Sequence, residues 1–291
     1  MRGRIATVLA ALLFLTIIYL CTPKSAYPLH IPGGYPYVKP KTPAIYAPTP
    51  NPPSTTPPPK KVIVKVQLPG EDLSWLLKLL PEWRNQVITL DLKFARLHDG
   101  AQRVDSGRIA DAYLSWIVTN YANLAETMVF VAPALAQQEA DAMKWRLPNQ
   151  ELISAIQHVR IEEVRKQGFA PLSCAAGTAC QEAISPLREP PDEFRTLEVR
   201  MAKAWEGLFN NTLVPAELAS PGGSEFVVAK EQVLKRSVEE YTRYWEWLAR
   251  TKMDDDSAGA LVQRLWHVIF GRASVWCPGA KECECGVFGR C

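Results

Sequence analysis

The sequence predicts an α/β domain with a largely parallel central sheet, carried behind an N-terminal membrane anchor and a proline-rich stalk. Three observations support this organisation. Short runs of β-branched residues alternate with amphipathic patterns over residues 62–291, an uncharged run fills residues 5–21, and prolines are concentrated between residues 22 and 61. Alternating strand and helix signals are typical of βα units that assemble a parallel sheet.

Four short runs rich in Val, Ile, Leu or Phe are predicted to be strands, at 62–66, 87–90, 128–131 and 225–228. The first helical pattern, at 73–80, stops at Pro81, because proline cannot continue a helix. Residues 107–124 give the strongest helical signal, with Ile109, Tyr113 and Ile117 on one face. Further helices are expected at 149–167, 193–209, 230–250 and 258–269.

The uncharged run at 5–21 is predicted to be a single transmembrane span. Its 17 residues would extend about 25 Å as a helix, close to the thickness of the thinner bilayers of the early secretory pathway. Arg2 and Arg4 precede it, so the positive-inside rule keeps residues 1–4 cytosolic. We therefore expect an uncleaved signal anchor and a type II membrane protein whose C-terminal domain lies in the lumen of the endoplasmic reticulum or Golgi. A cleaved signal peptide and a buried core helix are the alternatives.

Residues 22–61 are predicted to be a stalk. They hold 13 of the 24 prolines, and a segment so poor in backbone donors and apolar side chains favours an extended, semi-rigid spacer. Hydroxyl residues beside the prolines suggest O-glycans, although an inert linker is the simpler interpretation. The remaining residues, 62–291, are numerous enough for one sizeable domain.

Six of the seven cysteines lie in the domain, and their even number and clustering suggest disulfides in an oxidising compartment. They are Cys174, Cys180, Cys277, Cys283, Cys285 and Cys291. Free thiols or a metal site are the alternatives, but the chain has no CxxC pair of the kind zinc sites use. The pattern leaves the pairing open. One N-glycosylation sequon, at Asn210, also fits a lumenal glycoprotein.

Charge and motifs exclude several function classes. Thirty-three basic and 30 acidic residues give a net charge of +3, without the basic stripe that polyanion binding requires. The sequence has no GxGxxG, Walker A, HExxH or GxSxG motif. Its four histidines are scattered, which argues against a histidine-based metal centre.

Several blocks of the domain resemble a fungal family of uncharacterised proteins that carry a glycosyltransferase-like domain. These blocks are EDLSWL at 71–76, GR at 107–108, AYLSWIVTNYANL at 112–124, VFV at 129–131, YWEWL at 244–248, LWHVIFG at 265–271 and the cysteine-containing tail from Cys277 to Cys291. The resemblance covers nearly all of residues 62–291. The tryptophan–histidine block and the cysteine tail are its most specific parts.

The resemblance implies a fold similar to that of the nucleotide-sugar type A transferases. It also implies two kinds of reaction. One is group transfer to a glycan or a small metabolite, with Mn²⁺ or Mg²⁺ and a nucleotide donor. The other is secondary-metabolite biosynthesis, since some relatives are arginine-containing cyclodipeptide synthases that use aminoacyl-tRNA as substrate.

The chain departs from the pattern of this family at five places where charged or metal-ligating side chains are expected. The family has Glu at the positions of Ile109 and Gln263, and a double Asp where this chain has Asp91 alone. It has a His-rich stretch at residues 132–136, and paired Cys followed by Gln at residues 222–225. These losses raise the alternative of a catalytically degraded member that acts as a binding or scaffold subunit.

Two carboxylates and one histidine are the candidate catalytic residues. Asp91 follows the second predicted strand, at the edge where open α/β sheets bind ligands, and is the candidate ligand for Mn²⁺ or Mg²⁺. Glu225 precedes the fourth predicted strand and is a candidate base; an exposed edge residue is the simpler interpretation. His267 lies among apolar residues and is either a catalyst or a hydrogen-bonded core histidine.

Trp75 and Arg108 are the candidate substrate-binding residues. Trp75 offers a ring for stacking on a base or sugar, or simply packs in the core. Arg108 offers a bidentate contact to phosphate or carboxylate, or an ion pair with Asp105 or Asp111. The Asp-x-Asp spacing at 254–256 immediately precedes a predicted helix, where acidic residues favour helix capping.

Overall fold

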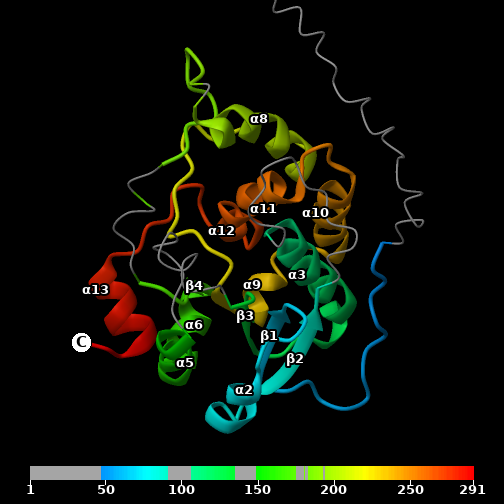
Figure 1. Ribbon diagram of the computed structural model, residues 1–291, viewed down its shortest axis with the longest axis vertical. Helices are drawn as coiled ribbons and strands as arrows, with labels where there is room; N and C mark the ends of the chain where they lie inside the picture. Colours follow the sequence, from blue (N-terminus) through cyan, green and yellow to red (C-terminus); the bar gives the residue numbers. More distant parts are fainter. Residues whose placement is uncertain (1–46, 91–105, 135–148, 175–179, 181–182, 193) are drawn as a thin grey trace, which may run out of the picture. The chain divides into compact units, whose positions relative to one another are not determined.

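The domain is organised around a five-stranded sheet in the order β2-β1-β3-β5-β4. A computed structural model describes residues 47–90, 106–134, 149–174, 180, 183–192 and 194–291 (Figure 1). The strands are β1 (Lys61–Gln67), β2 (Arg84–Thr89), β3 (Thr127–Val131), β4 (Phe169–Pro171) and β5 (Phe226–Ala229). β1 pairs in parallel with β2 and β3, whereas β5 is antiparallel to β3 and β4. The predicted α/β class is confirmed, with a mixed sheet in which β5 runs opposite to the other four described strands.

Both faces of the sheet are covered, which explains why its strands are continuous runs of apolar residues. Val62, Val64 and Val66 of β1 join the apolar cluster on one face. That cluster also contains residues of α3 (Ser106–Asn120), α8 (Thr196–Phe209), α10 (Val238–Arg250), α11 (Asp255–Gln263) and α12 (Trp266–Ile269). Ile63 lies on the other face with α2 (Ser74–Leu79), α5 (Asn149–His158) and α6 (Ile161–Gln167). Figure 1 shows these two layers of helices on either side of the strands.

Two predicted helices are each interrupted by a specific contact. The pattern at 149–167 divides into α5 and α6, and the Arg160 backbone N–H between them bonds the Val287 carbonyl oxygen at 2.8 Å. The pattern at 230–250 divides into α9 (Lys230–Val233) and α10 because Ser237 and Glu240 form a capping box that begins a new helix. The last pattern likewise divides into α11 and α12.

The sequence prediction missed β4, whose three residues follow α6 directly. Gly168, with φ of +80°, ends α6 and turns the chain into the strand. Such a short strand carries too few residues to show an alternation pattern, and Pro171 argues against a central strand. β4 is indeed at the edge of the sheet.

The last part of the predicted stalk is in contact with the domain. From Ala47 onward the described chain belongs to the same compact unit as the sheet. The Asn51 N–H bonds the Thr119 carbonyl oxygen at 2.8 Å. The Asn123 amide donates to the Pro52 carbonyl oxygen at 2.8 Å and accepts from the Ser54 N–H at 2.5 Å. The anchor and the stalk up to residue 46 lie outside the described residues. Within the residues described, no helix is long and apolar enough to cross a membrane.

The six cysteines of the domain form three disulfides, as their clustering predicted. The pairs are Cys174–Cys283, Cys180–Cys277 and Cys285–Cys291. The first two close long loops, of 109 and 97 residues, and long loops are where a cross-link most restricts the unfolded chain. Cys174 follows β4, so its bond ties the C-terminal segment to one end of the sheet.

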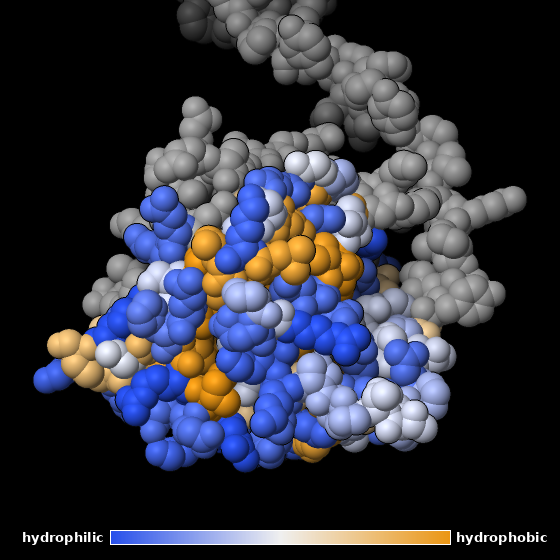
Figure 2. Space-filling view, turned by 90° about the horizontal axis from the view of Figure 1, so that it is seen from below, coloured by the Kyte–Doolittle hydropathy of each residue, from blue (hydrophilic) through white to orange (hydrophobic). Residues whose placement is uncertain are grey.

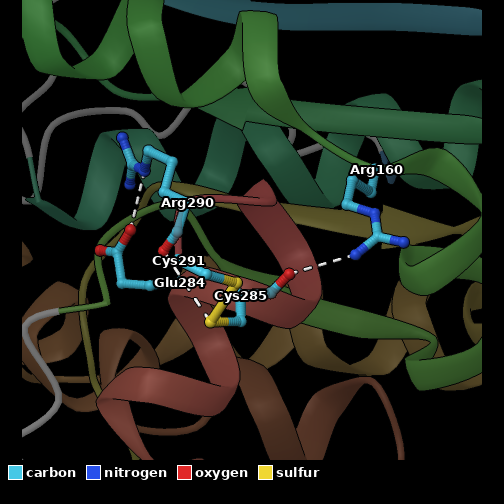
Figure 3. Close-up of a disulfide and its surroundings, with 5 residues drawn as sticks. All are labelled: Arg160, Glu284, Cys285, Arg290 and Cys291. Atoms are coloured by element: carbon cyan, nitrogen blue, oxygen red, sulfur yellow. Dashed lines mark hydrogen bonds and ion pairs between the residues drawn. A yellow bond between two sulfur atoms is a disulfide. The ribbon is translucent and has the colours of Figure 1, made fainter.

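The C-terminal tail packs on α6 through buried side chains and a few polar contacts. α13 (Ala280–Glu282) leads into a single π-helical turn, Cys283–Val287. In Figure 3 the Arg160 guanidinium reaches the Cys285 carbonyl oxygen, at 3.2 Å, and Arg290 pairs with Glu284 at 2.7 Å. Val287, the last residue of this turn, and Phe288, which follows it, are both buried.

One face of the domain is mostly hydrophilic, with a narrow strip of apolar residues among the polar ones (Figure 2). Exposed apolar side chains on α2 and β2 include Leu77, Leu79 and Val87.

Candidate functional site

The carboxyl ends of β1, β2, β3 and β4 meet at one edge of the sheet, together with the beginning of β5. Along the chain, β1 is followed by its neighbour β2, and β3 then lies on the other side of β1. The connections after β1 and β3 therefore leave in opposite directions. Open α/β sheets bind ligands at such a reversal, outside the carboxyl ends of the strands. This edge between β1 and β3 is the candidate site that the fold creates.

A buried ion pair occupies this position. The Lys65 Nζ atom, near the end of β1, lies 2.7 Å from Glu71 Oε1 and donates to the Ala132 carbonyl oxygen at 2.6 Å. The Lys65 side chain is 2% exposed and that of Glu71 12%. Glu71 also accepts from the backbone N–H groups of Leu68 at 3.2 Å and Ala134 at 2.9 Å. The pair thus joins the loops that leave β1 and β3.

The sequence reasoning missed Lys65 and Glu71 as site residues. The signal was present, because Lys65 interrupts the apolar strand sequence of β1, where residues are buried on both faces. A charged residue in such a strand is expected to have a partner.

Glu225 lies in the same row of the sheet. Lys65 is paired with Val131, and the pairing of Phe130 with Phe226 places Glu225 opposite Val131. Alternation along the strands puts Lys65 and Glu225 on the same face, with their Cα atoms about 10 Å apart. The Glu225 residue is 8% exposed, and its carbonyl oxygen accepts from the Leu172 N–H at 3.1 Å. The simpler interpretation of Glu225, an exposed edge residue, is therefore wrong.

His267 lies elsewhere, on the opposite face of β5, beside a small pocket. This pocket is lined by residues of β4, β5, α11 and α12 and by the segment 220–223, with His267, Phe226 and Trp266 among them. Gly222 and Gly223 have φ of +75° and +90°, values that favour glycine and allow the chain to turn beside the pocket before β5. His267 and Glu225 thus belong to two different faces of the sheet.

His267 is held as a neutral imidazole. Its Nε2 atom lies 2.9 Å from the Ser274 carbonyl oxygen. A carbonyl oxygen can only accept, so Nε2 carries the proton and Nδ1 is an acceptor. Burial lowers the pKa of His267 to about 4, and the bond to Ser274 opposes this shift only in part. A neutral ring accepts hydrogen bonds over the whole physiological pH range.

The remaining candidates have ordinary structural surroundings or lie outside the described residues. Arg108, in the first turn of α3, has its Nη1 atom 4.0 Å from Asp111 Oδ2, one of the two predicted pairings. Trp75 packs partly buried against the apolar cluster of α5 and α6. Asp91 comes shortly after β2 in the sequence and lies outside the described residues. Asp254 caps α11 by accepting from the Ser257 N–H at 2.8 Å, which confirms the capping interpretation.

Asn210 is exposed at the end of α8 in the left-handed conformation, with φ of 53°. The neighbouring Asn211 accepts from the Trp205 indole N–H at 3.1 Å and from the Leu213 N–H at 3.0 Å, so the turn that carries the sequon is well defined.

The Lys65–Glu71 pair leads to a stability prediction. Lys65→Met and Glu71→Gln should each lower the free energy of unfolding by about 3–5 kcal/mol, because each removes one of the two opposite charges of a buried pair. The double variant Lys65→Met/Glu71→Gln should lose less than the sum of the two single losses, as measured by urea denaturation. Glu163→Gln, which removes the exposed pair with Lys166, is the control and should have a far smaller effect. Additive losses in the double variant would contradict the interpretation.

The buried imidazole predicts an acid-dependent loss of stability. His267 takes up a proton near pH 4 when folded and near pH 6.5 when unfolded, so the unfolded state binds more protons between these values. Stability should therefore fall as pH drops from about 6.5 towards 4. At pH 4.5 the protonation of His267 in the unfolded chain should lower the free energy of unfolding by roughly 2–3 kcal/mol. His267→Gln should remove this part of the pH dependence in urea titrations at pH 7 and 4.5, and an unchanged dependence would disprove the assignment.

Comparisons with known proteins agree with the extent of the domain. Residues 62–286 match the family described as "Protein of unknown function (DUF3431)". No curated protein and no solved structure gives a match. Since the matched region covers most of the chain and begins at β1, the chain belongs to this family of unknown function.

Proposed function

We propose that the protein is a lumenal group transferase whose activated donor binds at the carboxyl edge between β1 and β3. The observation that carries the proposal is the placement of Lys65, Glu71 and Glu225 on one face of that edge. Buried charged groups gathered at a topological reversal are characteristic of a ligand site rather than of an ordinary core. The parallel order β2-β1-β3, with the reversal beside β1, supports a fold of the nucleotide-sugar type A kind.

In this proposal the protein positions and polarises its ligands. The Lys65–Glu71 pair holds in place the loops that leave β1 and β3, beside which the donor is proposed to bind. Glu225 is the carboxylate proposed as the base, since it faces the same side of the sheet. The acceptor is the hydroxyl of a glycan or of a small metabolite.

The described residues do not by themselves form a site for Mn²⁺ or Mg²⁺. Both Glu71 oxygens already accept hydrogen bonds, from Lys65 and from two backbone N–H groups. Among the described residues, no group of three His, Cys, Asp or Glu side chains is close enough to hold a metal ion. The sequence-based metal candidate, Asp91, lies outside them, and no step of the proposal uses a metal ion.

A second candidate function is that of a binding or scaffold subunit. It is favoured by Ile109, which stands where the resembling family has Glu and which is 1% exposed in the apolar cluster beside α11. An aminoacyl-tRNA-dependent synthase in the cytosol fits less well, because the disulfide between the buried residues Cys174 and Cys283 requires an oxidising compartment.

Donor binding is the direct test of the proposal. The full chain in detergent should bind a nucleoside diphosphate or nucleotide sugar in calorimetric titrations, run with and without Mn²⁺. Asp91→Asn, which alters the metal candidate, should weaken the binding measured with Mn²⁺ at least tenfold. Glu225→Gln, which removes the proposed base, and Glu246→Gln on α10 should leave donor binding unchanged. Absence of binding to every nucleoside diphosphate, with a folded protein, would exclude the transferase and leave the scaffold.

Glycosylation of Asn210 tests the lumenal location independently. When the full chain is made in microsomes, treatment with an N-glycosidase should shift its mobility, because the exposed sequon reaches the glycosylation machinery only in the lumen. Asn210→Gln should abolish the shift. Asn211→Gln is the matched control, since it keeps the sequon, and should retain it. A chain that is never glycosylated and is digested by external protease would place the domain in the cytosol.

A further inference from the structure

The C-terminal turn carries two cysteines that belong to disulfides in contrasting surroundings. Cys283 and Cys285 both lie in the π-helical turn. Cys283 is bonded to Cys174, and Cys285 is bonded to Cys291. Cys174 and Cys283 are 5% and 2% exposed, whereas Cys285 is partly buried and Cys291 is exposed. One turn therefore joins a bond inside the core to a bond at the surface.

This difference in burial decides which of the two bonds a thiol can reach. Thiol–disulfide exchange begins when a thiolate attacks one sulfur atom of the bond, so it requires access to that residue. Cys291 offers this access in the folded domain, whereas Cys174 and Cys283 are both shielded by the apolar cluster of α5 and α6. Exposed disulfides are the labile ones, and buried structural disulfides resist reduction.

The domain should remain folded when the Cys285–Cys291 bond opens. This bond spans a sequence separation of 6 residues, against 109 for Cys174–Cys283. A cross-link over a short loop restricts the unfolded chain least, so its loss costs the folded state least. Because Cys283 stays bonded to Cys174, the turn also remains attached to the segment that follows β4.

The exposed bond holds the end of the chain against the turn. Gly289, with φ of +62°, lets the chain bend back so that Cys291 meets Cys285. The Arg290 N–H bonds the Glu284 carbonyl oxygen at 2.8 Å, and the two side chains form the ion pair of Figure 3. Residues 284–291 thus form one closed loop.

This closed loop is in turn bonded to the junction between α5 and α6. The Arg160 N–H bonds the Val287 carbonyl oxygen at 2.8 Å, and its guanidinium bonds that of Cys285 at 3.2 Å. Arg160 is the residue before the first turn of α6, where a backbone N–H has no partner within the helix. The protection of this N–H therefore depends on the closed loop.

We propose that Cys285–Cys291 is a redox-sensitive clasp that a dithiol opens, which loosens the end of the chain from the α5–α6 junction. One thiolate of the dithiol bonds the Cys291 sulfur, and the Cys285 sulfur leaves and takes up a proton. The second thiol of the dithiol then displaces Cys291. The dithiol is oxidised to its own disulfide, and the protein gains two electrons and two protons. This inference does not rest on the transferase proposal.

A redox titration of the full chain in detergent tests the clasp. Reduced and oxidised dithiothreitol set the thiol ratio, and free thiols are alkylated and located by mass spectrometry. Cys285 and Cys291 should be half reduced at a ratio of reduced to oxidised dithiol at least tenfold lower than that for Cys174 and Cys283. At that ratio, hydrogen exchange of the Arg160 amide should become at least severalfold faster, because local opening exposes it.

Two variants separate the disulfide from the contacts beside it. Cys285→Ser/Cys291→Ser should exchange the Arg160 amide as fast as the reduced wild type and should not respond to the dithiol. Glu284→Gln removes the ion pair with Arg290 but keeps the disulfide, so it should behave like the oxidised wild type. Two results would overturn the proposal. One is reduction of both bonds at the same thiol ratio, and the other is an Arg160 amide that exchanges equally fast with the clasp open or closed.

Discussion

The ion pair between Lys65 and Glu71 fixes the geometry of the functional edge. A lysine within a strand that is covered on both faces must keep its charge compensated, because a lone buried ammonium group is far more costly than the pair. Its partner comes from the loop after β1, and that loop is also bonded to the chain after β3 at Ala134. The same interaction therefore fixes the positions of the loops after β1 and β3 at the carboxyl edge of the sheet. A hydrophobic residue at position 65 would pack as well, but it would not tie these loops together.

Much of the fold could be predicted because it follows from local patterns. Continuous apolar runs identify β1, β3 and β5, since strands covered on both faces bury every side chain. The prediction was wrong for helix boundaries that are set by long-range contacts. The break between α5 and α6 depends on a bond from Arg160 to Val287, more than one hundred residues away, and no periodicity encodes it. The disulfide pairing is of the same kind, since spacing shows that cysteines pair but not which ones meet.

The candidate site was predicted less completely, for a topological reason. Ligand-binding residues are expected just after parallel strands, and Asp91 was selected on this ground. β5, however, runs in the opposite direction, so the residue before it, Glu225, lies at the same edge as the residues after β1 and β3. The burial of Glu225 could not be inferred from its sequence context. For His267, by contrast, the apolar neighbours correctly indicated a buried, hydrogen-bonded side chain.

The reversed direction of β5 also constrains any chemistry that uses both Glu225 and His267. Alternation directs Phe226 and the His267 pocket to one face of the sheet, and Glu225 with Lys65 to the other. The sheet itself therefore separates His267 from Glu225. In the proposed function the donor chemistry therefore belongs to the charged edge, while His267 is a buried, hydrogen-bonded residue on the opposite face. The separation is a property of the backbone, so substitutions of His267 should leave binding at the charged edge intact.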